Sequence, residues 1–303
     1  MTESRLRIGS LALRNPVLTA AGTCGYGLEL ARYFDVAVLG GICTKGLSLE
    51  PRAGNPPPRI CETPAGMLNA IGLANVGVEA FLKEKLPELR TAGATVIANV
   101  LGTSPEEFAK LARRLDGAPG LHALELNLSC PNVKEGGLRL GTDPGRLKEA
   151  VAAARSATKL PLVAKLSPET ADICALARAA AAGGADAVSV MNTIRGMSID
   201  IHTRRPRLGN TLGGLSGPAI RPIAVRLVFE ASRAVSIPVI GVGGVMRWED
   251  AVEMMLAGAT AVQVGTASFL NPRAALDVLQ GLDAFCRAQK LGYDELIGAV
   301  QLE

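Results

Sequence analysis

Short apolar runs alternate with helix-like segments along the whole chain, and this alternation constrains the fold most. Eight runs are typical of buried strands: Pro16–Ala21, Val36–Thr44, Thr95–Val100, Leu121–Leu128, Leu162–Leu166, Ala187–Met191, Pro238–Val242 and Ala261–Val264. In a parallel sheet, helices cover both faces, so its strands are largely apolar along their whole length, as these runs are. The alternation therefore predicts a (β/α)8 TIM barrel over residues 1–303, as a single domain.

The segments between these runs predict the rest of the architecture. Residues Arg5–Asn15 alternate about Gly9-Ser10, as in a short N-terminal β-hairpin. Ser104 and Asp143 each precede a proline and are expected to cap helices, with Glu107 completing a capping box at the first. One expected helix follows Gly27 and ends near Phe34, and another begins at Ser104. The other expected helices are Gly77–Ala92, Asp143–Thr158, Pro168–Gly183, Ser216–Val235, Glu249–Ala257 and Pro272–Lys290.

Two stretches, Lys45–Val76 and Ile194–Gly214, have no helix pattern and are expected to be long βα-loop insertions. Loops of this length inside a domain are usually functional or disordered. An open doubly wound sheet is the alternative fold. It would be favoured by a Gly-x-Gly-x-x-Gly motif after the first strand, and Gly22-Thr-Cys-Gly-Tyr-Gly27 does not have that spacing.

Composition excludes several classes of protein. The net charge of +4 is spread along the chain and only 3% of residues are aromatic, which argues against nucleic acid. The six cysteines form no Cys-x-x-Cys pair, so no metal site is expected. The N-terminus has no signal-peptide core, and no uninterrupted apolar window of about 18 residues occurs. We therefore expect a cytoplasmic protein that does not enter a membrane.

Polar residues and glycines end most of the predicted strands. Catalytic residues of such barrels lie at this carboxyl end, which carries the βα loops. Turn preference would supply asparagine and glycine there, but a buried lysine is costly. The residues concerned are Ala21, Gly22, Thr44, Lys45, Asn99, Asn127 to Cys130, Lys165, Asn192, Thr193, Gly243, Gly244, Gly265 and Thr266.

The last two strands end in Gly241-Val-Gly-Gly244 and Gly265-Thr266, where barrels commonly bind phosphate. Glycine allows the backbone to approach an anion closely, although βα turns also use glycine. A lysine such as Lys165, placed beside a flavin, would stabilise the negative charge that builds up on reduction. A purely structural role for Lys165, as an ion pair with a carboxylate inside the barrel, is the alternative. We consider it less favoured because few carboxylates lie at the strand ends. Lys45 could hold a substrate carboxylate or be a solvated loop lysine.

The stretch Glu125-Leu-Asn-Leu-Ser-Cys-Pro-Asn-Val-Lys134 ends a strand-like run in a cluster of reactive groups. Pro131 removes a backbone donor and ends any ladder, so the Cys130 thiol should lie at a strand end. Asn127 and Asn132 can each donate and accept, which suits a planar, imide-like ligand. A structural role, as a small buried cysteine beside a turn, is the alternative.

Several motifs together resemble the class 1 dihydroorotate dehydrogenases, most closely the class 1B catalytic subunit. They are Thr44-Lys-Gly, Glu50-Pro-Arg-x-Gly-Asn-Pro, Asn69-Ala-Ile-Gly-Leu73, Asn127-Leu-Ser-Cys-Pro-Asn132, Lys165-Leu-Ser-Pro, Gly214-Leu-Ser-Gly-Pro and Gly241-Val-Gly-Gly244. The resemblance implies oxidation of (S)-dihydroorotate to orotate in de novo pyrimidine (UMP) biosynthesis. Cys130 would remove the C5 proton while hydride passes from C6 to N5 of FMN, beside Lys165.

The resemblance also assigns binding residues. Orotate would be held by Lys45, Asn69, Ala70, Ile71, Gly72, Leu73, Asn127, Asn132, Asn192 and Thr193. One FMN per chain would be held by Ala21, Gly22, Thr44, Lys45, Gly46, Asn99, Asn127, Lys165, Met191, Gly217, Gly243, Gly244, Gly265 and Thr266. Met191 and Gly46 are mild departures, because the family often has Ile or Val at the first position and Ala at the second.

The route of the electrons is not contained in this chain, which has neither iron–sulfur spacing nor an NAD fingerprint. Class 1B implies a partner subunit with FAD and a 2Fe-2S cluster that passes electrons to NAD+, in a homodimer and heterotetramer. The alternatives are a fumarate-dependent class 1A-like enzyme, a dihydropyrimidine dehydrogenase flavin subunit and a non-catalytic FMN- or phosphate-binding barrel. Membrane-bound class 2 is disfavoured because its members carry serine at position 130 and an N-terminal membrane segment.

Overall fold

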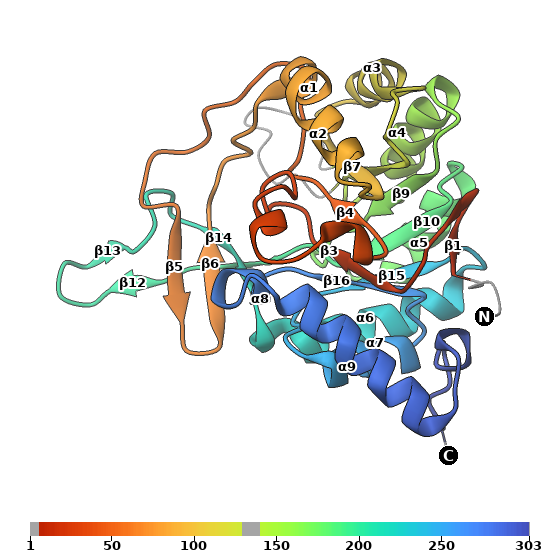
Figure 1. Ribbon diagram of the computed structural model, residues 1–303. Coiled ribbons are helices and arrows are strands. Elements are labelled where there is room, and N and C mark those ends of the chain that lie inside the picture. The colour runs from red at the N-terminus through yellow and green to blue at the C-terminus, as the bar shows by residue number, and fades with distance from the viewer. Residues whose placement is uncertain (1–5, 129–139, 303) are drawn as a thin grey trace.

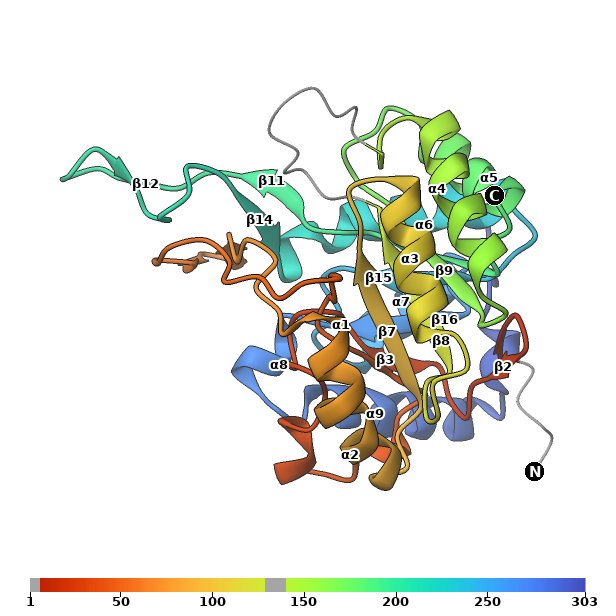
Figure 2. The same cartoon turned by 90° about the horizontal axis from the view of Figure 1, so that it is seen from above.

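The structure, a computed structural model, describes residues 6–128 and 140–302 (Figure 1). Eight parallel strands form one sheet in the order β3-β16-β15-β10-β9-β8-β7-β4. The two edges meet, since the Thr19 amide donates to the Gly41 carbonyl at 3.1 Å and the Gly40 amide to the Val17 carbonyl at 2.9 Å. The sheet is therefore a barrel surrounded by helices, and the predicted (β/α)8 architecture is confirmed (Figures 1 and 2).

Each barrel strand lies within a predicted apolar run, except that β7 ends one residue beyond its run, at Leu101. The strands are β3 (Val17–Thr19), β4 (Ile42–Cys43), β7 (Val96–Leu101), β8 (Ala123–Asn127), β9 (Leu162–Lys165), β10 (Ala187–Val190), β15 (Val239–Val242) and β16 (Ala261–Val264). Nearly all of their residues are buried, because helices cover the outside and side chains fill the inside. The carboxyl ends of β8 and β9 fall at Asn127 and Lys165, one residue before the predicted ends at Leu128 and Leu166.

The helices are α1 (Gly77–Ala80), α2 (Leu86–Thr91), α3 (Pro105–Leu115), α4 (Pro144–Ala157), α5 (Ile173–Ala182), α6 (Arg221–Ala234), α7 (Trp248–Leu256), α8 (Ala267–Leu270) and α9 (Ala274–Gln289). Ser104 and Asp143 cap α3 and α4, as predicted. Glu107 accepts from the Thr103 amide, one residue before the position that a capping box requires. Among the described residues, none of these helices is long and apolar enough to cross a membrane.

A short hairpin, β1 (Arg7–Ile8) with β2 (Leu11–Ala12), confirms the prediction for the N-terminal segment. Ile8 and Leu13 are buried in one cluster with Ala123 and Ala187, the first residues of β8 and β10. The hairpin therefore packs against the amino-terminal end of the barrel. Apolar contacts close that end, which leaves the carboxyl end for polar groups.

The helix predicted after the first strand is wrong, and so is the length of the second strand. Between Gly27, which has positive φ, and Asp35, which caps the next turn, the chain forms only the 3-10 turn Leu30–Arg32. A further 3-10 turn covers Val36–Val38, so the second barrel strand shrinks to β4. The expected helix Pro168–Gly183 also begins late, at Ile173, where Asp172 caps it.

The helix predicted over Gly77–Ala92 is divided into three parts. A π-helical segment, Phe81–Lys85, separates α1 from α2. Pro87 lies at the start of α2 and has no amide hydrogen to donate to the preceding turn. The missing donor explains why the regular hydrogen-bond ladder is interrupted here.

The two stretches predicted as loops form a second sheet instead. Strands β5 (Ile60–Thr63) and β6 (Gly66–Asn69) come from the first stretch, and β11 (Ile194–Gly196) and β14 (Gly213–Ser216) come from the second. They pair antiparallel in the order β11-β14-β6-β5, and the hairpin of β12 (Ile199–Asp200) and β13 (Arg205–Pro206) extends outward from them (Figure 2). Segments far apart in the sequence thus meet above the carboxyl end of the barrel.

Candidate active site

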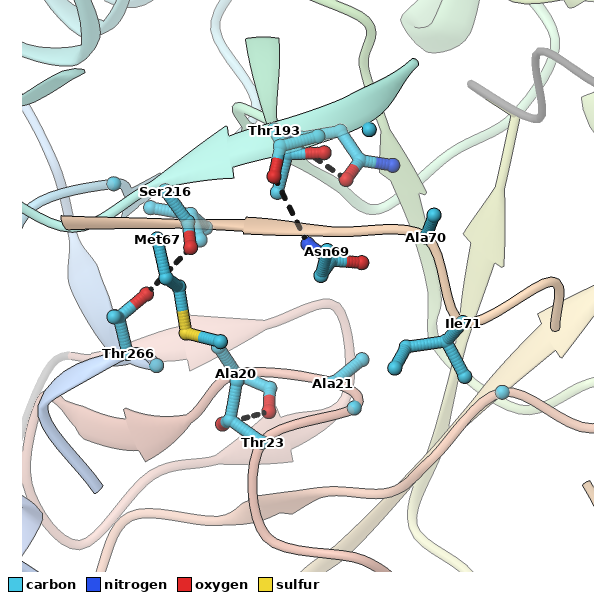
Figure 3. A pocket seen from close by; sticks show the side chains of 18 of the residues that line it. Ala20, Ala21, Thr23, Met67, Asn69, Ala70, Ile71, Thr193, Ser216 and Thr266 are labelled. Carbon is cyan, nitrogen blue, oxygen red and sulfur yellow. Dashed lines mark hydrogen bonds between the residues drawn. The ribbon is translucent and has the colours of Figure 1, made fainter. Parts of the chain in front are cut away.

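A cavity of about 510 Å³ lies at the carboxyl end of the barrel, between the strand ends and the antiparallel sheet (Figure 3). Its size is within the usual range for a small-molecule site. It brings together most of the predicted site residues: Ala21, Gly22, Lys45, Gly46, Asn69, Ala70, Ile71, Gly72, Leu73, Asn99, Asn127, Lys165, Met191, Asn192, Thr193, Gly217, Gly243, Gly244, Gly265 and Thr266.

Three predicted residues are not among them. Thr44 is fully buried beneath the cavity. Its hydroxyl accepts a hydrogen bond from the backbone amide of Asn99 at 3.4 Å and donates one to the backbone carbonyl of Lys45 at 3.2 Å. Its side chain therefore supports two lining residues and does not itself line the cavity. Cys130 and Asn132 lie outside the described residues.

Amide side chains line one side of the cavity and are held by one another and by the backbone. The Asn192 amide group donates to Asn127 Oδ1 at 3.3 Å, and Asn192 Oδ1 accepts from the Thr193 backbone amide at 2.8 Å. Asn69, at the end of β6, donates to the Gly214 carbonyl of β14 at 3.2 Å (Figure 3). The antiparallel sheet thus carries Asn69 to the barrel rim, which a structureless loop would not do.

Glycines permit the close approach of chain segments around the cavity. Gly217 has φ +96°, and a Cβ there would come within 2.7 Å of the Gly66 Cα in the neighbouring hairpin. Gly244 has φ +76°, and its Cβ would meet Arg221 Cβ at 2.5 Å. Both positions require glycine for their backbone conformation and for close packing, and both glycines also line the cavity.

A buried carboxylate lies beneath the floor of the cavity. Glu125 is 0% exposed, and its Oε1 accepts from Asn99 Nδ2 at 2.7 Å and from the Cys43 thiol at 3.2 Å. Its Oε2 accepts from Gln263 Nε2 at 2.7 Å and from the Ser189 hydroxyl at 2.9 Å. Five barrel strands, β4, β7, β8, β10 and β16, contribute to this cluster.

The Lys165 ammonium lies 3.7 Å from Glu125 Oε1, and both side chains are buried. The ion pair that the sequence disfavoured is therefore present, because the carboxylate comes from the middle of a strand and not from its end. Lys165 nevertheless lines the cavity as well. Lys165 thus lies between the cavity, which it lines, and the Glu125 carboxylate, which is its countercharge.

The pKa values of two groups reflect this environment. Burial by itself raises the pKa of Glu125, but Lys165 and the hydrogen bonds from Gln263, Cys43 and Asn99 outweigh it and lower the pKa below its ordinary value. Burial, followed by repulsion from Arg59, lowers the pKa of Lys45. An ionised carboxylate therefore lies beneath the floor with its cation beside it, and the rim carries a second lysine that an anionic ligand would stabilise in its charged form.

Several residues in and beneath the cavity were missed by the sequence reasoning. Gln263 is a polar residue inside the apolar strand β16, and Glu125 occupies a similar place in β8. A polar residue in a run that should be buried on both faces is the signal that could have identified both. Met67, Ser216, Glu169 and Arg195 also line the cavity. Thr63-Pro-Ala-Gly66, a turn-like link between two short alternating runs, could have revealed the hairpin that carries Met67.

The fold and this site define a (β/α)8-barrel protein with a polar ligand cavity at the carboxyl ends of its strands. The family model described as dihydroorotate dehydrogenase matches residues 5–286. The chain belongs to the dihydroorotate dehydrogenase family.

Three curated relatives illustrate the similarity. The chain is 56% identical over 297 residues to a protein of Trichlorobacter lovleyi, covering 98% of each chain. It is 53% identical over 300 residues to a protein of Pelobacter propionicus, covering 99% of each. It is 52% identical over 298 residues to a protein of Desulforudis audaxviator, covering 98% of this chain and 97% of the relative. All three are named dihydroorotate dehydrogenase B (NAD(+)), catalytic subunit.

Proposed function

We propose that this protein is the catalytic subunit of an NAD+-linked dihydroorotate dehydrogenase, which oxidises (S)-dihydroorotate to orotate for UMP synthesis. The observation that carries the proposal is the cavity itself. Lys45, Lys165 and the four predicted asparagines, Asn69, Asn99, Asn127 and Asn192, line one space. We also infer one FMN per chain, a homodimer and a heterotetramer with a subunit that holds FAD and a 2Fe-2S cluster. All these components would operate in the cytoplasm.

The residues present fit FMN. Asn99 Oδ1 and Gln263 Oε1 are buried on the cavity floor and have no hydrogen-bond partner among the described residues, so they suit a ligand with N–H or O–H donors. The turns after β15 and β16, with Gly243, Gly244 and Gly265, border the cavity at the strand pair where barrels commonly bind phosphate. FMN, when bound, supplies the acceptor for the substrate hydride, and the Lys165 ammonium would stabilise the negative charge that the ring acquires.

The substrate would be recognised by its ring amides and its carboxylate. Asn69, Asn127 and Asn192 offer donors and acceptors to the planar ring. Lys45 lines the same cavity and is half-buried, and the guanidinium of Arg59 is close enough to lower its pKa. A carboxylate bound at Lys45 would relieve that repulsion, which is the physical reason to place the substrate's charged group there.

Lys45→Ala tests this assignment. We expect orotate to bind about 10–100-fold more weakly, because a hydrogen bond to a charged group contributes roughly 1.5–3 kcal/mol. Uracil has no carboxylate and should bind much more weakly than orotate. The substitution should change the affinity for uracil little. Isothermal titration of the FMN-loaded protein measures both ligands, with Lys83→Ala, an exposed lysine, as the matched control. Equal losses for orotate and uracil would contradict a carboxylate at Lys45.

The function itself is tested with the purified chain and its flavin, without oxygen. Dihydroorotate should bleach the yellow flavin spectrum, and neither fumarate nor NAD+ should restore the colour until an electron-transfer subunit is added. Recovery with fumarate alone would indicate a class 1A-like enzyme instead. Bleaching by dihydrouracil but not by dihydroorotate would indicate a dihydropyrimidine dehydrogenase, and a bound flavin that no substrate reduces would indicate a non-catalytic barrel.

A further inference from the structure

Glu125 is the shared partner of the polar groups beneath the cavity, and no step of the proposed reaction uses it. Its carboxylate accepts hydrogen bonds from Asn99, Gln263, Ser189 and Cys43, and it faces the Lys165 ammonium. A carboxylate buried at 0% exposure among apolar strands is costly unless its partners need it. Those partners include three residues that line the cavity, namely Asn99, Lys165 and Gln263.

The carboxylate determines which way two amides point. An ionised carboxylate only accepts hydrogen bonds, so Asn99 and Gln263 must turn their NH2 groups toward Glu125. Their carbonyl oxygens are consequently directed away from it. Both oxygens are buried and have no partner within residues 6–128 and 140–302. The floor of the cavity thus presents two fixed acceptors, which a ligand with N–H or O–H donors would satisfy.

The carboxylate also fixes the charge of the lysine. Lys165 is 5% exposed, and a buried lysine without a countercharge loses its proton readily. The other titratable group facing Glu125 is the Cys43 thiol, whose pKa burial and then the carboxylate raise well above its usual value. Cys43 therefore remains a neutral donor, and Glu125 is the countercharge that the described residues place beside Lys165.

We propose that Glu125 is a positioning residue for the flavin: it keeps the Lys165 ammonium charged and holds the Asn99 and Gln263 carbonyl oxygens as acceptors on the cavity floor. This inference rests on the proposed FMN site. Glu125 would not touch the flavin and would act only through these three side chains.

Glu125→Gln should impair both effects. The new side chain has one NH2 group, which must face one of the neighbouring donors, so Asn99 or Gln263 is expected to flip and replace an acceptor with a donor on the cavity floor. The Lys165 ammonium loses the carboxylate beside it at the same time. FMN affinity should then decrease, and raising the pH should decrease it further, because a buried ammonium without a countercharge is disfavoured.

The experiment measures the FMN dissociation constant by flavin fluorescence between pH 7 and pH 9.5, without substrate. For the natural protein we expect a constant value within about twofold, since the Glu125 carboxylate lies beside the ammonium as its countercharge. For Glu125→Gln we expect about tenfold weaker binding at pH 7, a loss worth ~1.4 kcal/mol, and at least a further tenfold loss by pH 9.5. The double variant Glu125→Gln/Lys165→Met should bind weakly at every pH, without the alkaline loss.

Asp186→Asn is the matched control. Asp186 also faces a cation, Arg155 at 3.0 Å, and accepts from the Leu162 amide, but it lies at the amino-terminal end of the barrel. Its loss should lower stability and leave FMN affinity unchanged at every pH. A merely structural Glu125 would behave like Asp186, with a lower unfolding midpoint and unchanged, pH-independent FMN binding, and that result would overturn the proposal. An alkaline loss that persists in the double variant would overturn it too.

If Glu125→Gln does not yield folded protein, Glu125→Asp is the variant to measure. The charge remains near Lys165, but the shorter side chain cannot hold both amides. We expect weaker FMN binding, by about fivefold to tenfold, with no pH dependence. Unchanged affinity would overturn the proposal. Because these measurements omit dihydroorotate, they can fail while the proposed function stands, whereas a natural protein that does not bind FMN would contradict the proposed function.

Discussion

Replacing Cys130 with alanine is expected to lower kcat for dihydroorotate oxidation by roughly 10²–10⁴-fold, the usual contribution of a positioned general base. The expectation rests on the motif Asn127-Leu-Ser-Cys-Pro-Asn132, which follows strand β8 at the point where Asn127 enters the cavity. A thiol at this position can remove the C5 proton only as thiolate. Anaerobic stopped-flow reduction of the bound flavin measures the loss directly.

The pH dependence of the same reaction distinguishes a base from a structural cysteine. A free cysteine has a pKa near ~8.5, so the reduction rate should rise with pH through that region as the thiolate forms. In Cys130→Ala the residual rate should lose this rise. Cys174→Ala is the matched control, because Cys174 lies on helix α5 and does not line the cavity. A Cys130→Ala variant that retains the rate within tenfold would remove Cys130 from the catalytic role.

Replacing Glu125 with leucine is expected to lower the free energy of unfolding by about 3–5 kcal/mol at pH 7, because breaking a buried ion pair leaves an uncompensated charge. Lys165 would lose its countercharge, and the donors of Asn99 and Gln263 would lose their acceptor. Urea unfolding of the natural and variant proteins, followed by far-UV circular dichroism, measures the difference.

The difference should also depend on pH, with a definite sign. The pKa of Glu125 is lowered in the folded protein, so its contribution is fully present above the ordinary glutamate value of ~4.3. That contribution disappears as pH falls through the lowered folded value. The gap between natural protein and Glu125→Leu should therefore be largest near neutral pH and should shrink below about pH 4.

Glu79→Gln provides the contrasting surface case. Glu79 pairs with Arg114 at 2.6 Å, and hydrogen bonding to this arginine lowers its pKa, but both side chains are well exposed. Exposed pairs contribute little to stability, so the unfolding curve should hardly move. If Glu125→Leu lowered the free energy of unfolding as little as Glu79→Gln, the ion pair of Glu125 and Lys165 would not stabilise the fold more than an exposed pair does.

Local signals were reliable where one short segment carries all the information. The caps Ser104 and Asp143 were predicted correctly because a side-chain oxygen reaches an amide only three residues away. The predicted helix before Phe34 failed because only a 3-10 turn forms between Gly27, which has positive φ, and Asp35, which caps the next turn. The predicted Gly77–Ala92 helix was interrupted at Pro87, a breaker that was visible in the sequence.

Long-range pairing was not accessible in the same way. The two long stretches were predicted as loops, yet Leu68 of β6 pairs with Leu215 of β14, and both belong to a small apolar cluster with Leu208. Each of these strands is too short to be distinguished from loop by periodicity. Only their mutual hydrogen bonds define them, and those bonds join segments more than a hundred residues apart in sequence.

The sequence by itself determined the barrel, the end of it that carries the polar groups, and the family, because alternating apolar runs and short motifs are local properties of the chain. The tertiary structure alone decided that Glu125 faces Lys165, that Thr44 lies beneath the cavity, and that Asn69 reaches the rim. Closing the barrel brings side chains from strands that are distant in sequence into one interior. Which of them become partners depends on the register of neighbouring strands, and no single segment encodes that register.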